Sequence, residues 1–120
     1  MALKRIILEM GTGNDLYGED YTKAARRAVQ DALHHSSLTL FRSLGLDRDL
    51  MQIEVRIGVQ KPDAVDRAAV AAELPYGKVV VVPVLGGLNI ADPVNRTLSV
   101  VATAGITVRY DIEPGRFRPA

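Results

Sequence analysis

A strict alternation of apolar and other residues places the strongest constraint on how this 120-residue chain folds. Every second position from 51 to 59 carries an aliphatic side chain or Met, and most positions between them are polar. The apolar members are Met51, Ile53, Val55, Ile57 and Val59. A period of two places them on one face of an extended strand. This part of the chain therefore predicts a half-buried β-strand that needs other elements to cover its apolar face.

Helical and extended patterns lie on both sides of this strand. Residues 3–10 alternate and predict a first strand, whereas apolar residues recur at helical spacing from Asp20 to Leu33. Asp20 or Thr22 can cap that helix, and residues 38–46 predict a short helical turn. After the alternating strand, Pro62 is suited to open a second helix that runs to residue 74.

The last third of the chain is extended. Residues 79–85 predict a strand that is apolar on both faces, and Pro83 favours an edge position because it cannot donate a ladder hydrogen bond. Residues 89–95 predict a turn-rich connection, and residues 97–110 a long strand with a bulge at Gly105. The order is β-α-β-α-β-β, an α+β domain with a four-stranded sheet and two helices on one face.

The composition limits the number of domains and the partners. With 48% hydrophobic residues the chain can bury a core by itself, so we expect a single domain over residues 1–112 and a flexible tail over 113–120. A net charge of +1 provides no field for nucleic acid or an anionic membrane. Because cysteine is absent, disulfides and thiolate metal sites are excluded. We expect a cytoplasmic protein, since no signal peptide or apolar run of ~20 residues occurs. We also expect neither a metal nor a cofactor.

The strand at residues 79–85 also predicts self-association. Val80, Val82 and Val84 cannot share a sheet face with Val79 and Val81. One of these faces can be covered by the two helices, which leaves the other partly apolar. A homo-oligomer, as a trimer or a larger assembly, would cover this second face.

The segment Gly11-Thr12-Gly13-Asn14-Asp15-Leu16-Tyr17-Gly18 is the most specific local feature, and we expect it to form a loop between the first strand and the first helix. A dinucleotide fingerprint would need glycine where Leu16 stands, and a phosphate loop would need Gly-Lys-Ser or Gly-Lys-Thr. Two interpretations remain. The glycines and Asp15 could serve the local structure, or the loop could bind a small molecule.

If this loop is a binding site, its side chains suggest roles. Glu9 or Asp15 would act as acid, base or hydrogen-bond acceptor, and Tyr17 would donate a hydrogen bond or stack. His35 either interacts with the end of its helix or transfers protons, and it cannot readily share a metal with the adjacent His34. Further ligand contacts would come from Gly11, Thr12, Gly13, Asn14, Gly18, His35 and Lys61.

The chain resembles a small family of conserved bacterial proteins of unknown function. The resemblance is carried by four stretches, at residues 6–18, 20–25, 31–38 and 72–77. The hallmark of that family is a Gly-x-Gly-x-Asp-x-His-Gly motif, and Tyr17 stands here at the position of its histidine. Any role of that histidine is therefore not carried over to this chain.

The order of elements is also similar to the trimeric chorismate-mutase-like fold, which reactive-imine deaminases and the domains of ring-opening amidohydrolases share. This resemblance implies an oligomer that binds a small polar or heterocyclic molecule at subunit interfaces. If such a protein is an enzyme, it would hydrolyse or deaminate a cyclic amide. The competing interpretation is a non-catalytic structural or regulatory oligomer in which the Gly-rich segment is purely structural.

Overall fold

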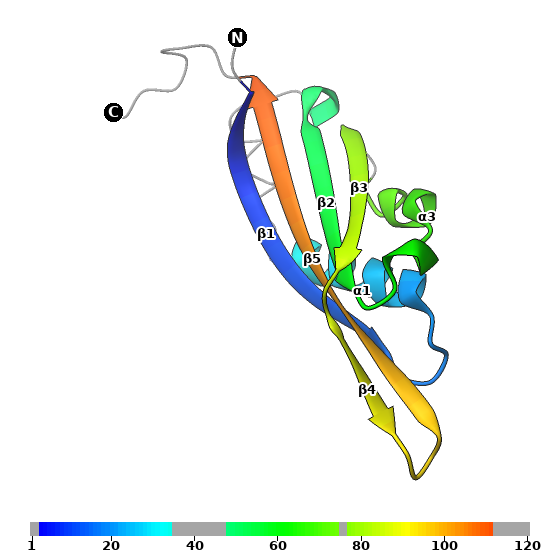
Figure 1. The fold of residues 1–120 in the computed structure, drawn as a ribbon. Coiled ribbons are helices and arrows are strands. Elements are labelled where there is room, and N and C mark those ends of the chain that lie inside the picture. Colours follow the sequence, from blue (N-terminus) through cyan, green and yellow to red (C-terminus); the bar gives the residue numbers. More distant parts are fainter. Residues whose placement is uncertain (1–2, 35–47, 75–76, 112–120) are drawn as a thin grey trace.

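The computed structural model describes residues 3–34, 48–74 and 77–111 (Figure 1). The predicted helical turn at residues 38–46, His35 and the predicted tail lie outside these residues. The strands are β1 (Leu3–Asp15), β2 (Gln52–Val59), β3 (Lys78–Leu85), β4 (Leu88–Asp92) and β5 (Thr97–Asp111). The helices are α1 (Tyr21–His34), α3 (Arg67–Ala71) and the 3-10 turns η1 (Arg48–Leu50) and η2 (Pro62–Ala64). None of the helices in this part of the chain is long and apolar enough to cross a membrane.

The strands form one sheet in the order β1-β5-β2-β3, and β4 pairs with the first residues of β5. β5 runs antiparallel to β1, β2 and β4, whereas β2 and β3 are parallel. The predicted α+β class is confirmed, and β3, with Pro83, lies at an edge as expected. The predicted number of strands was one too low, because the stretch expected as a turn-rich connection contains β4.

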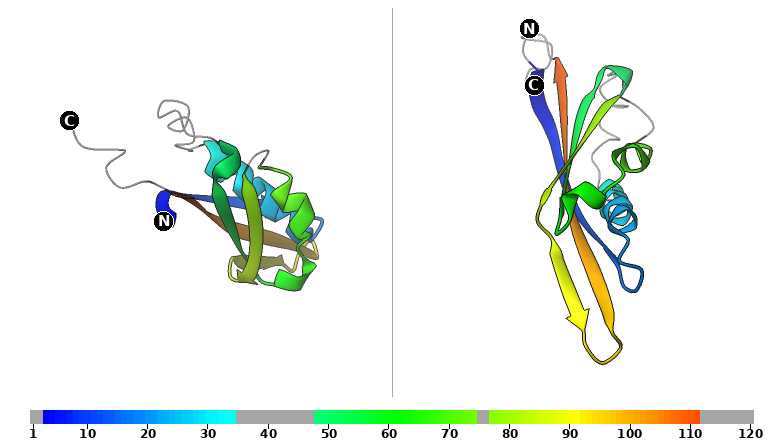
Figure 2. Two further views of the ribbon diagram at one scale, coloured as in Figure 1. Left: turned by 90° about the horizontal axis from the view of Figure 1, so that it is seen from above. Right: turned by 45° about the vertical axis from the view of Figure 1, so that its right-hand side comes forward.

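Both α-helices of the described residues lie on one side of the sheet, and the other side is left without a helix (Figure 2). The strand residues that face the helices are buried. Val55 of β2 and Val100 and Val108 of β5 have 0% exposure, as does Met51 directly before β2. Helix α1 contributes four alanines to the core, Ala24, Ala25, Ala28 and Ala32. Small side chains on this helix allow its backbone to approach the sheet closely.

Helix α1 begins where the sequence predicts it. Asp20 precedes the first helical residue, and its Oδ1 accepts a hydrogen bond from the backbone N–H of Lys23 at 3.0 Å. A side-chain oxygen that accepts from the third helical N–H is the usual N-cap, and it satisfies a donor that the helix itself leaves unpaired. Of the two predicted capping residues, Asp20 therefore performs this function.

The second predicted helix is shorter than expected. Residues 62–74 divide into η2 and α3, and Asp66 caps α3 by accepting hydrogen bonds from the backbone N–H groups of Ala68 and Ala69. The extended backbone of Asp66 interrupts the helical path. Its own N–H donates to the Thr22 hydroxyl at 2.8 Å, which ties this break to α1. A tertiary contact therefore decides where the helix begins.

Glycines allow the chain to cross from β3 to β4. Gly87 has a positive φ of 62°, and a Cβ on it would lie 2.2 Å from the carbonyl oxygen of Val101. A Cβ on Gly86 would lie 3.0 Å from the Cα of Gly58. β4 can thus continue alongside β5 beyond the end of β2, and the two form a projecting hairpin (Figure 1). The bulge expected at Gly105 was wrong: β5 is regular there, and the register shift lies in β1 between Arg5 and Ile7.

Candidate functional site

The Gly-x-Gly-x-Asp segment is part of β1, so the prediction that it forms a loop was wrong. Gly11, Gly13 and Asp15 pair with Ala104, Ala102 and Val100 of β5, residues that are buried under the helices. Directly opposed residues of neighbouring strands share a face of the sheet. The two glycines and the aspartate therefore face α1, and only residues 16–18 form a bend before it.

The glycines allow α1 to lie directly on β1. A Cβ on Gly11 would lie 2.4 Å from both the carbonyl oxygen of Ala28 and the backbone nitrogen of Ala32. On Gly13 it would lie 2.3 Å from the backbone nitrogen of Ala28. These distances leave no room for even one methyl group between strand and helix. A ligand therefore cannot lie against this face of the two glycines.

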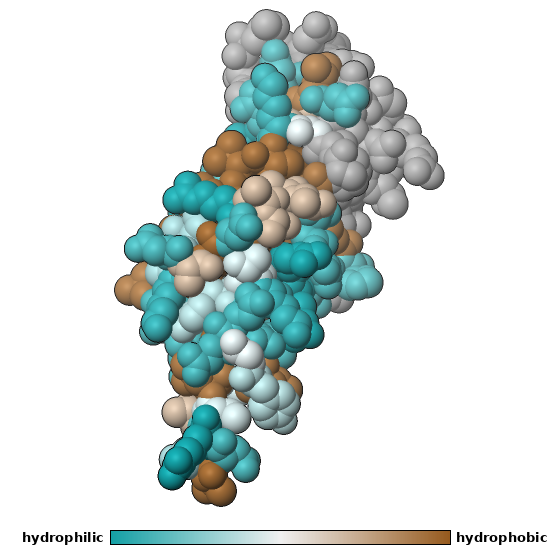
Figure 3. Space-filling view, turned by 90° about the vertical axis from the view of Figure 1, so that its right-hand side faces the viewer, coloured by the Kyte–Doolittle hydropathy of each residue, from teal (hydrophilic) through white to brown (hydrophobic). Residues whose placement is uncertain are grey.

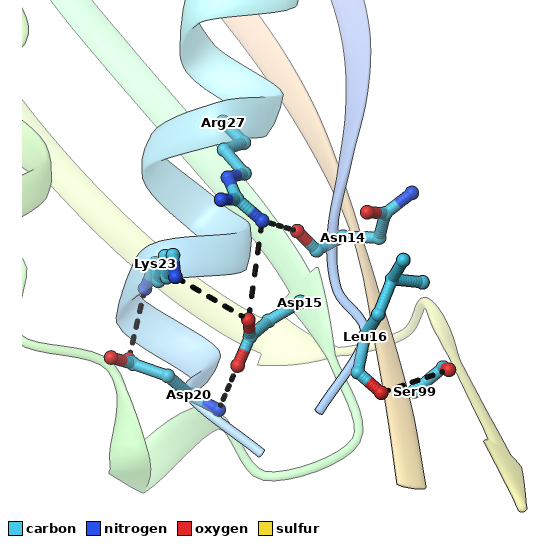
Figure 4. Close-up of polar contacts among 7 residues, drawn as sticks. All are labelled: Asn14, Asp15, Leu16, Asp20, Lys23, Arg27 and Ser99. Atoms are coloured by element: carbon cyan, nitrogen blue, oxygen red, sulfur yellow. Dashed lines mark hydrogen bonds and ion pairs between the residues drawn. The ribbon is translucent and has the colours of Figure 1, made fainter. Parts of the chain in front are cut away.

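Asp15 connects the end of β1 to the start of α1 (Figure 4). Its carboxylate is buried, with Oδ2 accepting a hydrogen bond from the backbone N–H of Asp20 at 3.0 Å. Oδ1 lies 3.7 Å from Nζ of Lys23 and 3.9 Å from a guanidinium nitrogen of Arg27. A Cβ on Gly18 would lie 2.7 Å from Oδ2, so the bend must pass close to this carboxylate.

Side chains of α1 also occupy part of the free edge of β1. Nη1 of Arg27 donates a hydrogen bond to the carbonyl oxygen of Asn14 at 2.6 Å (Figure 4). The backbone N–H of Thr12 donates to Oδ2 of Asp31 at 2.9 Å. Polar groups of an edge strand that are satisfied in this way are less available to pair with another chain. Asp31, which a nucleotide site would have placed after a strand, instead supports the edge of β1.

The other predicted site residues lie in different parts of the molecule. Glu9 is half-buried on the side of β1 that faces α1, whereas the side chain of Tyr17 is 78% exposed in the bend. Lys61 is exposed before η2 and lines a separate depression with residues 60–64. His35 lies outside the described residues. The catalytic and binding roles suggested for this set stay predictions.

A hollow of about 620 Å³ lies mainly on the face of the sheet opposite the helices and reaches Asp31 of α1 at the edge of β1. Three neighbouring strands contribute to it, and β3 and its turn form one wall. Its floor and rim include Met10, Thr12, Arg56, Gly58, Thr103 and Gly105. Of the residues predicted from the sequence, Gly11 and Thr12 reach it. Glycines within the strand patterns at positions 58 and 105 were the available signal, because glycine inside a strand often marks a place of close approach.

The face around this hollow is apolar at its margins. Five large side chains are exposed there: Leu8 47%, Met10 70%, Val80 60%, Leu88 62% and Ile90 56%. Their register partners on β5 and β2 lie on the side away from the helices. By contrast, the side that carries the helices is largely hydrophilic (Figure 3). We call the helix-free side the open face.

Charged residues lie in the middle of the open face. The carboxylate of Glu54 on β2 is 2.9 Å from a guanidinium nitrogen of Arg56 and 3.4 Å from one of Arg109 on β5. All three side chains are at least 30% exposed, so each pair contributes at most ~1 kcal/mol to stability. Among the described residues, no cluster of three or more His, Asp or Glu could hold a metal ion.

Fold and site together define an α+β protein in which, among the described residues, helices cover one face of the sheet and the other face carries none. The chain belongs to the Lin0512 family of conserved hypothetical proteins, whose family model matches residues 5–108. The crystal structure of an FtsZ-like protein of unknown function from Nostoc punctiforme PCC 73102 is similar, with 34% identity and a TM-score of 0.81 over 93% of this chain and 99% of that one. A comparison with curated proteins returned no match.

Proposed function

We propose that the protein is a homo-oligomeric assembly protein whose subunits associate through the open face of the sheet. The observation that carries this proposal is the set of five large apolar side chains exposed on that face. These side chains lie along the margins of one sheet face, and packing against a second sheet would bury them. Each buried aliphatic side chain would then contribute ~1.5–3 kcal/mol of transfer free energy before the cost of association is subtracted.

A second copy of the chain fits this face better than an unlike partner. The face carries both signs of charge in its centre, with Glu54 between Arg56 and Arg109, and apolar side chains at both margins. A patch of this composition can be complementary to itself, as an interface between identical subunits requires. The net charge of +1 gives no attraction for a polyanion. Assembly as a trimer or a larger oligomer stays a prediction.

In this proposal the Gly-x-Gly-x-Asp segment is structural. Asp15 already accepts a hydrogen bond from Asp20 and lies near two cations, so its carboxylate has a role in holding α1. The glycines face the backbone of α1 rather than a cavity. These contacts support the non-catalytic interpretation over hydrolysis or deamination by Glu9, Asp15 and Tyr17. The open face is the better candidate for a small-molecule site.

The experiment compares two aspartate substitutions on the open face with one outside it. We expect wild-type protein to elute as an oligomer whose mass is measured by light scattering, and the double variant Val80→Asp/Ile90→Asp to elute as a monomer. Buried unpaired carboxylates would oppose association strongly. Val94→Asp is the matched control, since Val94 is 87% exposed in the turn between β4 and β5.

Two results would overturn the proposal. The first is a monomeric wild-type protein throughout a dilution series. The second is an oligomer that persists in Val80→Asp/Ile90→Asp with an unchanged circular dichroism spectrum. Loss of the oligomer only in this double variant, with Val94→Asp unaffected, would support association through the open face.

A further inference from the structure

We infer that the hollow on the open face binds a small, flat molecule that carries one carboxylate, and that Arg56 anchors this carboxylate. The inference goes beyond the proposed assembly. The residues that line the hollow come from β1, α1, β2, β5 and the end of β3 with its turn. Its volume of about 620 Å³ lies within the range of ~300–1,000 Å³ that is typical of small-molecule sites.

The register of the strands builds the hollow from two neighbouring rows of residues. In one row, Gly105 of β5 lies between Met10 of β1 and Arg56 of β2. In the next row, Thr103 lies between Thr12 and Gly58. Gly105 stands in the middle of the first row, and Gly58 is the β2 residue of the second row. Side chains therefore surround Gly105, where the sheet presents only its backbone, and Gly58 lies beside the turn at Gly86.

Gly105 leaves space that the fold does not use. A Cβ on Gly105 would have nothing within 4 Å, in contrast to the glycines of β1, which are pressed against α1. Gly58 is closer to its neighbours, since a Cβ there would lie 2.6 Å from Oγ1 of Thr103. The floor at Gly105 is thus bare backbone of a regular strand, and a flat group can approach it closely.

Arg56 provides the charge that such a ligand would meet. One guanidinium nitrogen is held at 2.9 Å by the carboxylate of Glu54, which orients the group while other N–H donors remain. Guanidinium binds a carboxylate with two parallel hydrogen bonds. Glu54 pairs with Arg56 and Asp31 lines the hollow, so two carboxylates lie near the one guanidinium. Their repulsion grows with the charge of a ligand, so a dianion such as phosphate is disfavoured more strongly than a monoanion.

The remaining walls suit a flat organic body. Met10 of β1 and Val84 and Leu85 of β3 supply apolar surface, and Thr12 and Thr103 contribute hydroxyl groups that can donate or accept. A mostly apolar cavity with a few polar groups is the usual composition of a small-molecule site. The molecule would lie over Gly105 with its carboxylate at Arg56.

The test uses pairs of probes that differ only in charge, benzoate with benzamide and nicotinate with nicotinamide. We expect the two carboxylates to shift the backbone amide signals of Gly58 and Gly105 in ¹H–¹⁵N spectra, with a Kd on the order of 1 mM for such small probes. The amides should bind at least ~10-fold more weakly, because a charge-assisted hydrogen bond is lost.

Three variants locate the binding. Arg56→Gln should weaken carboxylate binding ~10-fold and bring it to the level of the amides. Arg109→Gln is the matched control: Arg109 also contacts Glu54, but it lines a different depression, so binding should be unchanged. Gly105→Val places a side chain into the empty space and should abolish binding while the protein stays folded.

The inference is overturned if neither carboxylate shifts Gly58 and Gly105, if Arg56→Gln and Arg109→Gln have equal effects, or if Gly105→Val binds as wild type. The titrations are repeated in Val80→Asp/Ile90→Asp, which leaves the residues of the hollow intact. Carboxylate binding that persists in a wild-type protein found to be monomeric would support the site and contradict only the assembly. Absence of carboxylate binding both in a wild-type oligomer and in monomeric Val80→Asp/Ile90→Asp would contradict only the site, because the open face is uncovered in that variant.

Discussion

The two faces of β1 show how one strand can serve opposite purposes. Toward α1 it presents Gly11 and Gly13, where a single methyl group would meet helix backbone at 2.3–2.4 Å. Toward the open face it presents Met10, which is 70% exposed, and Thr12. Glycine on the covered face is thus a requirement of packing, whereas Gly105 on the open face is bordered by empty space. The same residue type has different consequences because the neighbours differ.

Among the substitutions that test this comparison, Gly13→Ala should have the largest effect on stability. The Cβ would meet backbone atoms of α1, which cannot rotate away as a side chain does, so helix and strand must separate. We expect Gly13→Ala to lower the free energy of unfolding by ~3 kcal/mol or more. The measurement is chemical denaturation followed by far-UV circular dichroism.

Gly105→Ala is the matched control on the open face. Nothing lies within 4 Å of its Cβ position, and alanine loses less conformational entropy in a strand than glycine does. The substitution should leave stability unchanged or raise it by up to ~1 kcal/mol. Similar losses at both positions would contradict the difference between the two faces.

Alternation and helical spacing were sufficient to predict the α+β class and most elements of the sheet. They placed β2, the long β5 and the start of α1 at Asp20 correctly. The short strand β4 was missed because its pairing with β5 is a tertiary fact, and its five residues contain the turn-forming Asn89 and Asp92. The break before α3 was missed for a similar reason, since Thr22 of α1 fixes it.

The candidate site was harder to predict than the fold. Three glycines in eight residues favour a loop when the sequence is viewed alone, and only the alanine-rich helix packed on them explains why Gly11 and Gly13 can occupy a strand. If the predicted strand had been continued past Met10, its alternation would have placed Gly11, Gly13 and Asp15 on one face. Arg56 and Gly105 could not be recognised as neighbours from the sequence, because this requires the register of β2 and β5.

Removal of the Asp15 side chain should have the next largest effect. Asp15→Ala leaves the partly buried N–H of Asp20 without its acceptor and removes the anion near Lys23 and Arg27. We expect a loss of ~1–3 kcal/mol and faster hydrogen exchange in the first turn of α1. Asp20→Asn is the control, because asparagine caps a helix about as well as aspartate. A stable Asp15→Ala protein that instead loses binding of a small molecule would favour a ligand role for Asp15.

Charge on the open face should matter less than charge on the covered face. Glu54→Gln removes the ion pairs with Arg56 and Arg109, whose side chains are 62% and 42% exposed. The expected loss is below ~1 kcal/mol and should decrease further in high salt, because exposed pairs are screened. Thermal unfolding at low and high ionic strength measures this. A loss as large as that of Asp15→Ala would mean that the open face is not as exposed to solvent as its side chains indicate.

The smallest effect is expected in the turn of the hairpin, far from α1. Asp92 accepts hydrogen bonds from the side chain and backbone N–H of Asn95 and from the backbone N–H of Val94, and these hold the pKa of its carboxyl below the ordinary value. A lowered pKa means that the charged form stabilises the turn above the ordinary pKa, and that this contribution is lost as the pH falls through the lowered one.

Asn95→Ala removes the largest cause of the shift, so the Asp92 pKa measured by NMR titration should rise toward its ordinary value of ~3.9. Because this carboxylate is not buried, the stabilisation that Asn95→Ala removes is small, and the midpoint of thermal unfolding at neutral pH should fall only slightly. A pKa that stays low in Asn95→Ala would show that the backbone N–H groups alone hold the carboxylate.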